Sequence, residues 1–146
     1  MSARDVPMNL SHKPVVACDY QELNKRLGNF DSSDSQFLSV GRAQWDQNDL
    51  SVKVFRIGNS GRWSAQSEEV PVWRLPYMFA MLLETMLMIQ SSDKKIQGSV
   101  GAEVVVPEDI DFLRSAIKQY ATPLQEGLPR VKELLDKIDL GKLGSL

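Results

Sequence analysis

Hydrophobic and polar residues alternate along residues 37–66 and then give way to an apolar run over residues 77–89. The segments FLSVGRAQW, LSVKVFRI and RWSAQS each show the alternation typical of half-buried strands. They are divided by DQND and GNSG, two separators of hairpin-loop length. KPVVACDY at residues 13–20 predicts a further short strand. We therefore expect an antiparallel β-meander, with residues 13–67 mainly in β-structure.

The apolar run predicts a core helix over residues 71–90, because Pro71 or Pro76 fits the first turn of a helix. The β-branched residues of SVGAEVVVP favour a strand at 99–106. Residues 107–140 have amphipathic helical spacing, and a cap at Thr122 predicts a separate last helix that begins with PRVKELLDKI. The predicted fold class is α+β: an antiparallel β-meander packed on a central apolar helix, with C-terminal helices.

Composition is that of an ordinary globular chain. The 146 residues are 42% hydrophobic and 25% charged, which predicts a single domain, 1–146, with a polar and flexible segment at 1–12. A net charge of −2 gives no general attraction to DNA, RNA or an anionic membrane. One cysteine excludes an intrachain disulfide, and the beginning of the chain lacks the apolar run of a signal peptide. We expect a cytoplasmic protein of a bacterium or of a phage-infected cell.

The two separators also predict a strand register. If DQND closes the first hairpin, Trp45 faces Leu50 and Arg42 faces Lys53. Val52 and Val54 then point towards the apolar helix, and Lys53 points to the opposite, polar face. Arg42 beside Lys53 is a like-charge pair, which a sheet disfavours. Either both side chains extend into solvent or lie beside a glutamate, or the pair is kept for an anionic ligand.

The second explanation predicts an anion site, because arginine suits phosphate or carboxylate geometry and lysine adds a point charge. Neutral polar groups of the same sheet face would complete it with hydrogen bonds. The candidate ligand-binding residues are Arg42, Gln44, Lys53, Ser64, Gln66, Glu68, Trp73 and Arg74, with Arg56 and Arg62 as alternatives if the register is displaced by one residue.

Three short motifs carry a resemblance to a known family. SVGRAQW, KVFR and WSAQSEEVPVWR occur in this order. They resemble the series S-L-G-x-A-Q-W, K-V-W-R and W-S-x-Q-S-E-E-x-P-x-x-R of an uncharacterised family of small bacterial and phage proteins. The resemblance covers residues 10–90 and implies no assigned activity. Trp73 stands where the relatives tend to have histidine, which implies that any chemistry shared at that position is altered here.

The residues for catalysis are sparse. The only histidine, His12, lies in the polar N-terminal segment and is expected to be exposed, whereas Cys18 is expected to be a small core residue. Glu68 and Glu69 could act as the general base of a hydrolase, but adjacent residues of a strand point to opposite faces. Two acids before a helix are also favoured by its dipole. We predict no enzyme, no catalytic residue, no metal site and no cofactor.

Two functions remain open. The first is a non-enzymatic protein that binds a phosphate-bearing small molecule such as a nucleotide. One form of this function is an anti-defence protein that sequesters immune signalling nucleotides. The second is a protein–protein interaction module, such as an immunity or inhibitor protein, that uses the same polar sheet face. In either case the apolar helix predicts a homo-oligomer with Met81 or Met88 at the contact.

Overall fold

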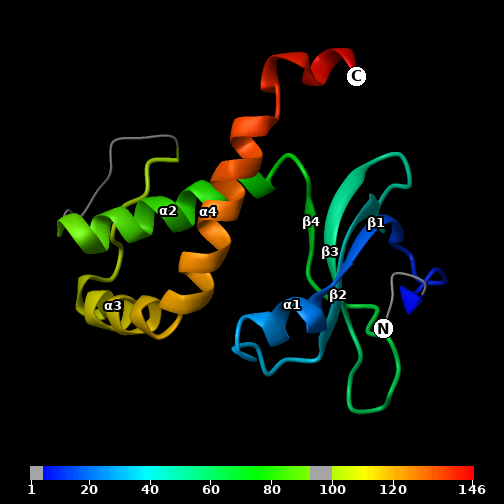
Figure 1. Cartoon of the computed structure of the whole chain (residues 1–146), viewed down its shortest axis with the longest axis horizontal. Coiled ribbons are helices and arrows are strands. Elements are labelled where there is room, and N and C mark those ends of the chain that lie inside the picture. Colours follow the sequence, from blue (N-terminus) through cyan, green and yellow to red (C-terminus); the bar gives the residue numbers. More distant parts are fainter. Residues whose placement is uncertain (1–4, 93–99) are drawn as a thin grey trace. The chain divides into compact units, whose positions relative to one another are not determined.

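The structure is a computed structural model in which residues 5–92 and 100–146 are described (Figure 1). Contacts along the chain divide it into two compact units, Met1–Pro107 and Glu108–Leu146. Each unit is described by itself. Together they contain an antiparallel sheet and several helices, which confirms the predicted α+β class.

The first unit is built on a four-stranded sheet of order β1-β2-β3-β4, and every neighbouring pair is antiparallel. The strands therefore follow one another across the sheet as in a meander. The predicted strand RWSAQS is not formed, because Trp63 makes only an isolated bridge with Ile57 and the last strand lies at Glu69–Pro71. The elements are β1 (Lys13–Asp19), α1 (Tyr20–Arg26), β2 (Ser35–Arg42), β3 (Leu50–Arg56) and β4 (Glu69–Pro71). Asp19 ends β1 and caps α1, because its carboxylate accepts the backbone N–H of Glu22.

The predicted register of the β2–β3 hairpin is wrong. Arg42 pairs with Leu50 and not with Lys53, whose partner is Ser39. The strands separate earlier than the sequence indicated, because residues 43–49 form a loop with its own hydrogen bonds. Trp45 Nε1 donates to the Asp49 carboxylate at 2.7 Å, and the Ala43 N–H donates to the Asp49 carbonyl at 3.0 Å. Arg42 and Lys53 are therefore not cross-strand neighbours, and the like-charge pair predicted from the sequence does not form.

The changed register exchanges the faces of β3. Lys53 is the buried residue, with 2% of its surface exposed, whereas Val52 and Val54 are half-buried on the other face. The buried positions of β2 and β3 alternate, as expected for one face of a sheet. They combine aromatic and polar side chains: Ser35, Phe37, Ser39, Ser51, Lys53 and Phe55. The face that looks polar in the sequence is thus the inner face.

The apolar core on this inner face centres on Phe37 and Phe55, both fully buried. The other residues that form this core with them are Val6, Leu10, Ala17 and Trp63, so none of its members belongs to the predicted core helix. Val6 and His12, which lie in the segment 1–12 that was predicted to be polar and flexible, are buried. Residues 1–4 lie outside the described residues. We refer to residues 5–12 as the N-terminal segment.

The apolar helix, α2 (Leu75–Ser91), begins later than the predicted residue 71, because Pro71 belongs to β4. Glu84 and Met88 are its buried residues. The Glu84 carboxylate accepts the backbone N–H groups of Val100 and Ala102 at 3.2 and 3.0 Å. The strand predicted at 99–106 is not formed over residues 100–106, where Glu103 makes only an isolated bridge, and residue 99 lies outside the described residues.

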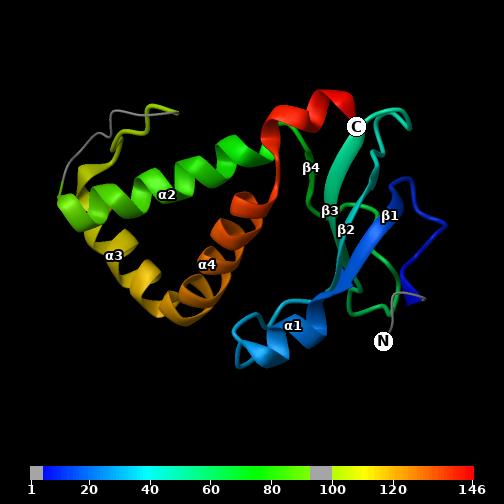
Figure 2. The ribbon, with the colours of Figure 1, turned by 45° about the horizontal axis from the view of Figure 1, so that its top comes forward.

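The helices predicted over 107–140 are present, but their boundaries differ. They are η2 (Pro107–Asp109), α3 (Ile110–Gln119), α4 (Ala121–Lys137) and η3 (Leu140–Ser145). Figure 2 shows α3 and α4 joined at a tight turn as the two arms of a V. The separate helix predicted from Pro129 is wrong, because α4 continues through Pro129 as one helix. A proline inside a helix removes one backbone hydrogen bond but does not always end the helix.

Candidate functional site

Five polar residues from distant parts of the chain meet on the inner face of the sheet. His12 Nδ1 lies 3.0 Å from Glu69 Oε1 and 3.0 Å from Ser51 Oγ, and His12 Nε2 lies 3.1 Å from Ser39 Oγ. Lys53 Nζ lies 3.7 Å from Glu69 Oε2. We call His12, Ser39, Ser51, Lys53 and Glu69 the buried polar network. It links the N-terminal segment to β2, β3 and β4.

The directions of the hydrogen bonds follow from the carboxylate. Glu69 can only accept, so His12 Nδ1 donates to it and Nε2 accepts from the Ser39 hydroxyl. Ser51 also donates its hydroxyl proton to Glu69 Oε1, at 2.7 Å. The backbone N–H of Gln44 is a further donor to this oxygen, at 3.0 Å. One carboxylate thus orders the loop after β2, strand β3 and the N-terminal segment.

Burial has the opposite effect on the pKa values of His12 and Glu69 from that of their hydrogen bonds and charges. Burial lowers the pKa of His12 below its usual 6.5, although the hydrogen bond and the charge of Glu69 raise it. Burial would raise the pKa of Glu69, but hydrogen bonds from Ser51, the Gln44 N–H and His12 hold it below its usual 4.5. At neutral pH the network therefore contains a neutral imidazole and an ionised Glu69.

The order Ser39–His12–Glu69 has the connectivity of a nucleophile, a base and an orienting acid. However, the exposed fractions of Ser39 and His12 are 2% and 1%, and the side chain of Glu69 is 2% exposed. A nucleophile has to reach a substrate, and the Ser39 hydroxyl is enclosed in this conformation. The hydrogen bonds of His12 join the N-terminal segment to three strands.

Sequence reasoning missed His12, which it placed in solvent. The structure buries it and stacks its ring edge-to-face with Phe55, with 5.6 Å between the ring centroids. A signal was available in the strands. Ser39, Ser51 and Lys53 are polar residues at alternating strand positions, and if that face is buried they need a hydrogen-bonding partner from elsewhere.

The predicted anion-site residues do not converge. Lys53 lies inside the sheet beside Glu69, and Arg42 is exposed and donates to the Gln47 carbonyl at 2.7 Å. Arg56 is also neutralised: it forms ion pairs with Glu68 at 2.6 Å and with Asp34 at 3.1 Å. Two of the predicted cations therefore contact carboxylates of the chain itself.

The remaining candidates lie in loops and beside α2. Ser64 donates its N–H to the Arg56 carbonyl, and its hydroxyl accepts the N–H of Gln66 at 3.3 Å. The side chain of Gln44 is exposed and Arg62 is exposed. Trp73 and Arg74 remain together, with the guanidinium carbon of Arg74 5.0 Å from the Trp73 ring centroid.

Trp73 also lies at one end of an exposed apolar surface, which continues along α2. Trp73 and Tyr77 are 61% and 60% exposed, and Met81 is 45% exposed. Residues four apart on a helix lie on one face, so Tyr77 and Met81 form one row and Met78 and Leu82 a neighbouring row. We call Trp73, Tyr77, Met78, Met81 and Leu82 the α2 surface, and all five are exposed. Met88, the other predicted contact residue, is buried.

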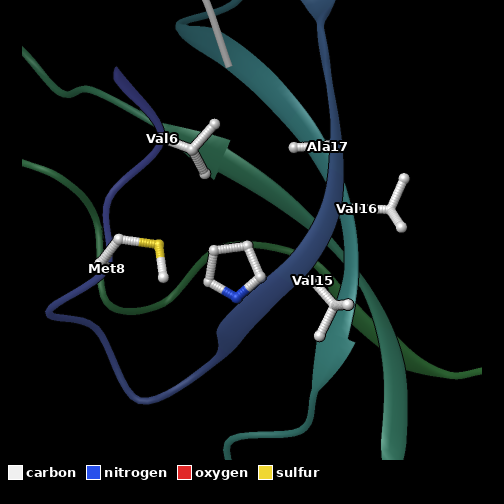
Figure 3. A pocket seen from close by; sticks show the side chains of 6 residues that line it. Val6, Met8, Val15, Val16 and Ala17 are labelled. Carbon is white, nitrogen blue, oxygen red and sulfur yellow. The ribbon is translucent and has the colours of Figure 1, made fainter. Parts of the chain in front are cut away.

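Two grooves of the sheet are lined mainly by apolar side chains. One of about 230 Å³ lies between the N-terminal segment and β1, where Figure 3 shows Val6 and Met8 on one side of β1 and Val16 pointing away from them. A second, of about 170 Å³, crosses the outer sheet face and is lined by Val16, Ala17, Cys18, Leu38, Ser39, Val40 and Val52. Neither groove is lined by a charged residue, so neither has the composition of an anion site.

Among residues 5–92 and 100–146, no cluster of histidine, cysteine and acidic residues has the arrangement of a metal site. Within the same residues no helix combines the length and hydropathy needed to span a membrane. No curated protein and no solved structure is significantly similar to the chain. Residues 4–140 match a family of unknown function, DUF6530. The chain therefore belongs to the DUF6530 family.

Proposed function

We propose that this chain is a protein-interaction module and that the α2 surface is where it binds its partner. The observation that carries this proposal is the exposure of Tyr77 and Met81 on α2 and of Trp73 in the turn before it. Tryptophan, tyrosine and methionine are enriched at protein interfaces relative to the rest of a protein surface. Tryptophan and tyrosine are also frequent among the residues that contribute most to binding.

The energy available from this surface is considerable. Burying a large apolar side chain contributes roughly 1.5–3 kcal/mol relative to leaving it in water. The five side chains are 38–61% exposed, so each contributes about half of this amount, and together they offset a large part of the entropic cost of association. Monomeric proteins rarely leave a contiguous apolar patch of this kind without a role. The long, unbranched methionine side chains also adapt to different partner shapes.

The proposed function is non-enzymatic. It is supported by the burial of His12 and of Ser39 and Ser51, the two serines whose hydroxyl groups contact its imidazole. The free Cys18 and the absence of any second cysteine fit a reducing compartment, and we place the activity in the cytoplasm.

The test compares three forms of the protein as bait in extracts of the cells that produce it: wild type, Met81→Glu and Gln90→Glu. Gln90 is an exposed residue of α2 outside the two rows of the α2 surface, so Gln90→Glu adds the same charge to the same helix. The proposal expects a protein that wild type and Gln90→Glu retain and that Met81→Glu loses. Equal retention by all three forms would rule out the α2 surface as the binding site.

A second candidate is a phosphate-bearing ligand such as a nucleotide, held in solution as a sponge would hold it. Arg74 beside Trp73 favours it, because an aromatic ring can stack on a base while a guanidinium group binds phosphate. The link to phage anti-defence rests on analogy with small phage proteins. The test is thermal unfolding with a panel of nucleotides. At 100 times its dissociation constant a ligand adds about 2.7 kcal/mol to the free energy of unfolding.

Arg74→Ala is the variant for this test. Replacing the predicted ligand-binding residue Lys53 would not measure binding, because Lys53 is buried. A nucleotide whose stabilisation disappears in Arg74→Ala would favour the second candidate. The homo-oligomer stays a prediction. Of the two residues expected at its contact, only Met81 is exposed, and light scattering over a concentration series tests it.

A further inference from the structure

Along residues 73–92, the segment that contains the α2 surface, the exposed charge is of one sign. This segment has one basic and one acidic residue, Arg74 and Glu84. Glu84 is buried, and its carboxylate oxygens accept the backbone N–H groups of Val100 and Ala102. Arg74 is exposed at the beginning of α2 and lies over the Trp73 ring. The exposed charge at the α2 surface is therefore positive and is located at one end.

The shape of the α2 surface is that of a short strip. Its two rows, Tyr77 with Met81 and Met78 with Leu82, run along the helix axis, and Trp73 lies before the first turn. With a rise of 1.5 Å per residue, the helical part of the strip from Tyr77 to Leu82 is roughly 7.5 Å long, and Trp73 extends it beyond the beginning of the helix. Rows of side chains on one helix pack into the grooves between rows on another. A strip of this kind fits the apolar face of a second helix.

From these two features we propose that the α2 surface binds an amphipathic helix of a partner protein, with carboxylate side chains at the end of its apolar stripe. This inference rests on the proposed function and adds the chemistry of the partner. The apolar stripe packs against Tyr77, Met78, Met81 and Leu82. The carboxylates meet the guanidinium group of Arg74, whose planar fork can donate two hydrogen bonds to one carboxylate.

Charge complementarity distinguishes this partner from other helices. A basic amphipathic helix would bring lysine or arginine next to Arg74, and like charges in contact disfavour the complex. A second copy of α2 presents Arg74 and no exposed carboxylate, so it lacks the complementary charge. The occupant that matches both the apolar rows and the charge is an acidic amphipathic helix.

The test uses two synthetic helical peptides of 18 residues as probes. Both have the same leucine and methionine stripe, and one has glutamate pairs at both ends of the stripe where the other has lysine pairs. Placing the pairs at both ends makes the comparison independent of the orientation of the peptide. Fluorescence anisotropy of labelled peptide measures the dissociation constant for the full chain. The expected result is at least tenfold tighter binding of the glutamate peptide, with a preference that decreases as salt is added.

Two variants locate the effect. Arg74→Glu is expected to invert the preference, and Arg62→Glu, an exposed arginine outside α2, is expected to leave it unchanged. The inference is overturned if the peptides bind equally, if neither binds, or if Arg74→Glu keeps the preference for glutamate. Such failures would concern the chemistry of the partner only. The proposed function fails separately, when Met81→Glu retains the same proteins as wild type.

Discussion

His12 and Glu69 are 57 positions apart in the sequence, and their side chains meet at 3.0 Å within the sheet. This contact connects the N-terminal segment to the short strand β4, which otherwise pairs only with β3 among the described strands. Because Ser39 and Ser51 bond to the same imidazole, His12 satisfies polar groups of three strands at once. The histidine that appeared exposed in the sequence is a central contact of the first unit.

Replacing His12 by alanine is therefore expected to destabilise the protein. The change leaves Ser39 without its acceptor and removes one donor to Glu69, and each buried polar group left unsatisfied costs about 1–3 kcal/mol. We expect a loss of about 3 kcal/mol in the free energy of unfolding by urea. Gln90→Ala, at an exposed position of α2, serves as the control and should stay within about 0.5 kcal/mol of wild type.

Lys53→Ala tests the exchanged faces of β3. It leaves Glu69 buried without its ammonium partner, and breaking a buried ion pair costs about 3–5 kcal/mol. Val54→Ala, at the half-buried neighbouring position, should cost less. Urea unfolding of both variants measures the difference. A Lys53→Ala protein as stable as wild type would show that Lys53 is in solvent, as the sequence had suggested.

The sequence predicts the strands around these two positions but not which of their faces is buried. The alternation of residues 37–57 predicted strands correctly, because period-two patterns identify strands whichever face is buried. For β3 it gave the wrong inner face, because the assumed register placed Val52 and Val54 inwards in place of Ser51 and Lys53. Burial of the polar face depends on His12 and Glu69, which reach it from outside the hairpin. A local pattern does not contain such long-range hydrogen bonds.

The candidate site was predicted only in part, for a related reason. Trp73 and Arg74 were recognised as candidates, and their contact is local in sequence. The assumed cluster of Arg42, Lys53 and Gln66 required a register that a four-residue loop would give. The hydrogen bond from Trp45 to Asp49 instead holds a longer loop. Loop conformations depend on such side-chain bonds, which hydropathy does not reveal.

The stability of the protein should depend on pH through the buried polar network. The pKa of His12 is lowered, so the unfolded chain takes up this proton more readily than the folded protein, and stability falls as pH drops below 6.5. The pKa of Glu69 is also lowered, so its contribution is present above 4.5 and is lost as pH falls further. Both groups therefore destabilise the fold in acid.

His12→Gln separates the two contributions, because glutamine does not titrate. Urea midpoints measured between pH 7 and pH 4 should fall for wild type from about pH 6.5 downwards. For His12→Gln the midpoint should stay nearly constant until the carboxylates begin to titrate. Parallel curves for the two proteins would contradict the burial of a neutral His12.

Gly41→Ala is expected to destabilise the sheet although it adds only a methyl group. A Cβ at position 41 would lie 2.1 Å from the carbonyl oxygen of Lys13 and 2.9 Å from Cα of Pro14. Both are backbone atoms, so β1 would have to move away from β2. We expect a loss of at least about 2 kcal/mol, in the range found for overpacked positions. Gly127→Ala, where nothing lies within 4 Å of the added methyl, is the control in α4.

The central claim is that the α2 surface binds a protein, and crosslinking from within that surface tests it most directly. A photoreactive phenylalanine analogue replaces Tyr77 in the full chain, and cells that naturally produce the protein are illuminated. Tyr77 is 60% exposed, so the replacement leaves the fold intact. We expect one main adduct that contains a different protein and that disappears when Met81→Glu is added. Illumination that yields only the 16.4 kDa chain, or only a crosslink between two copies of it, would show that the α2 surface does not bind a different protein.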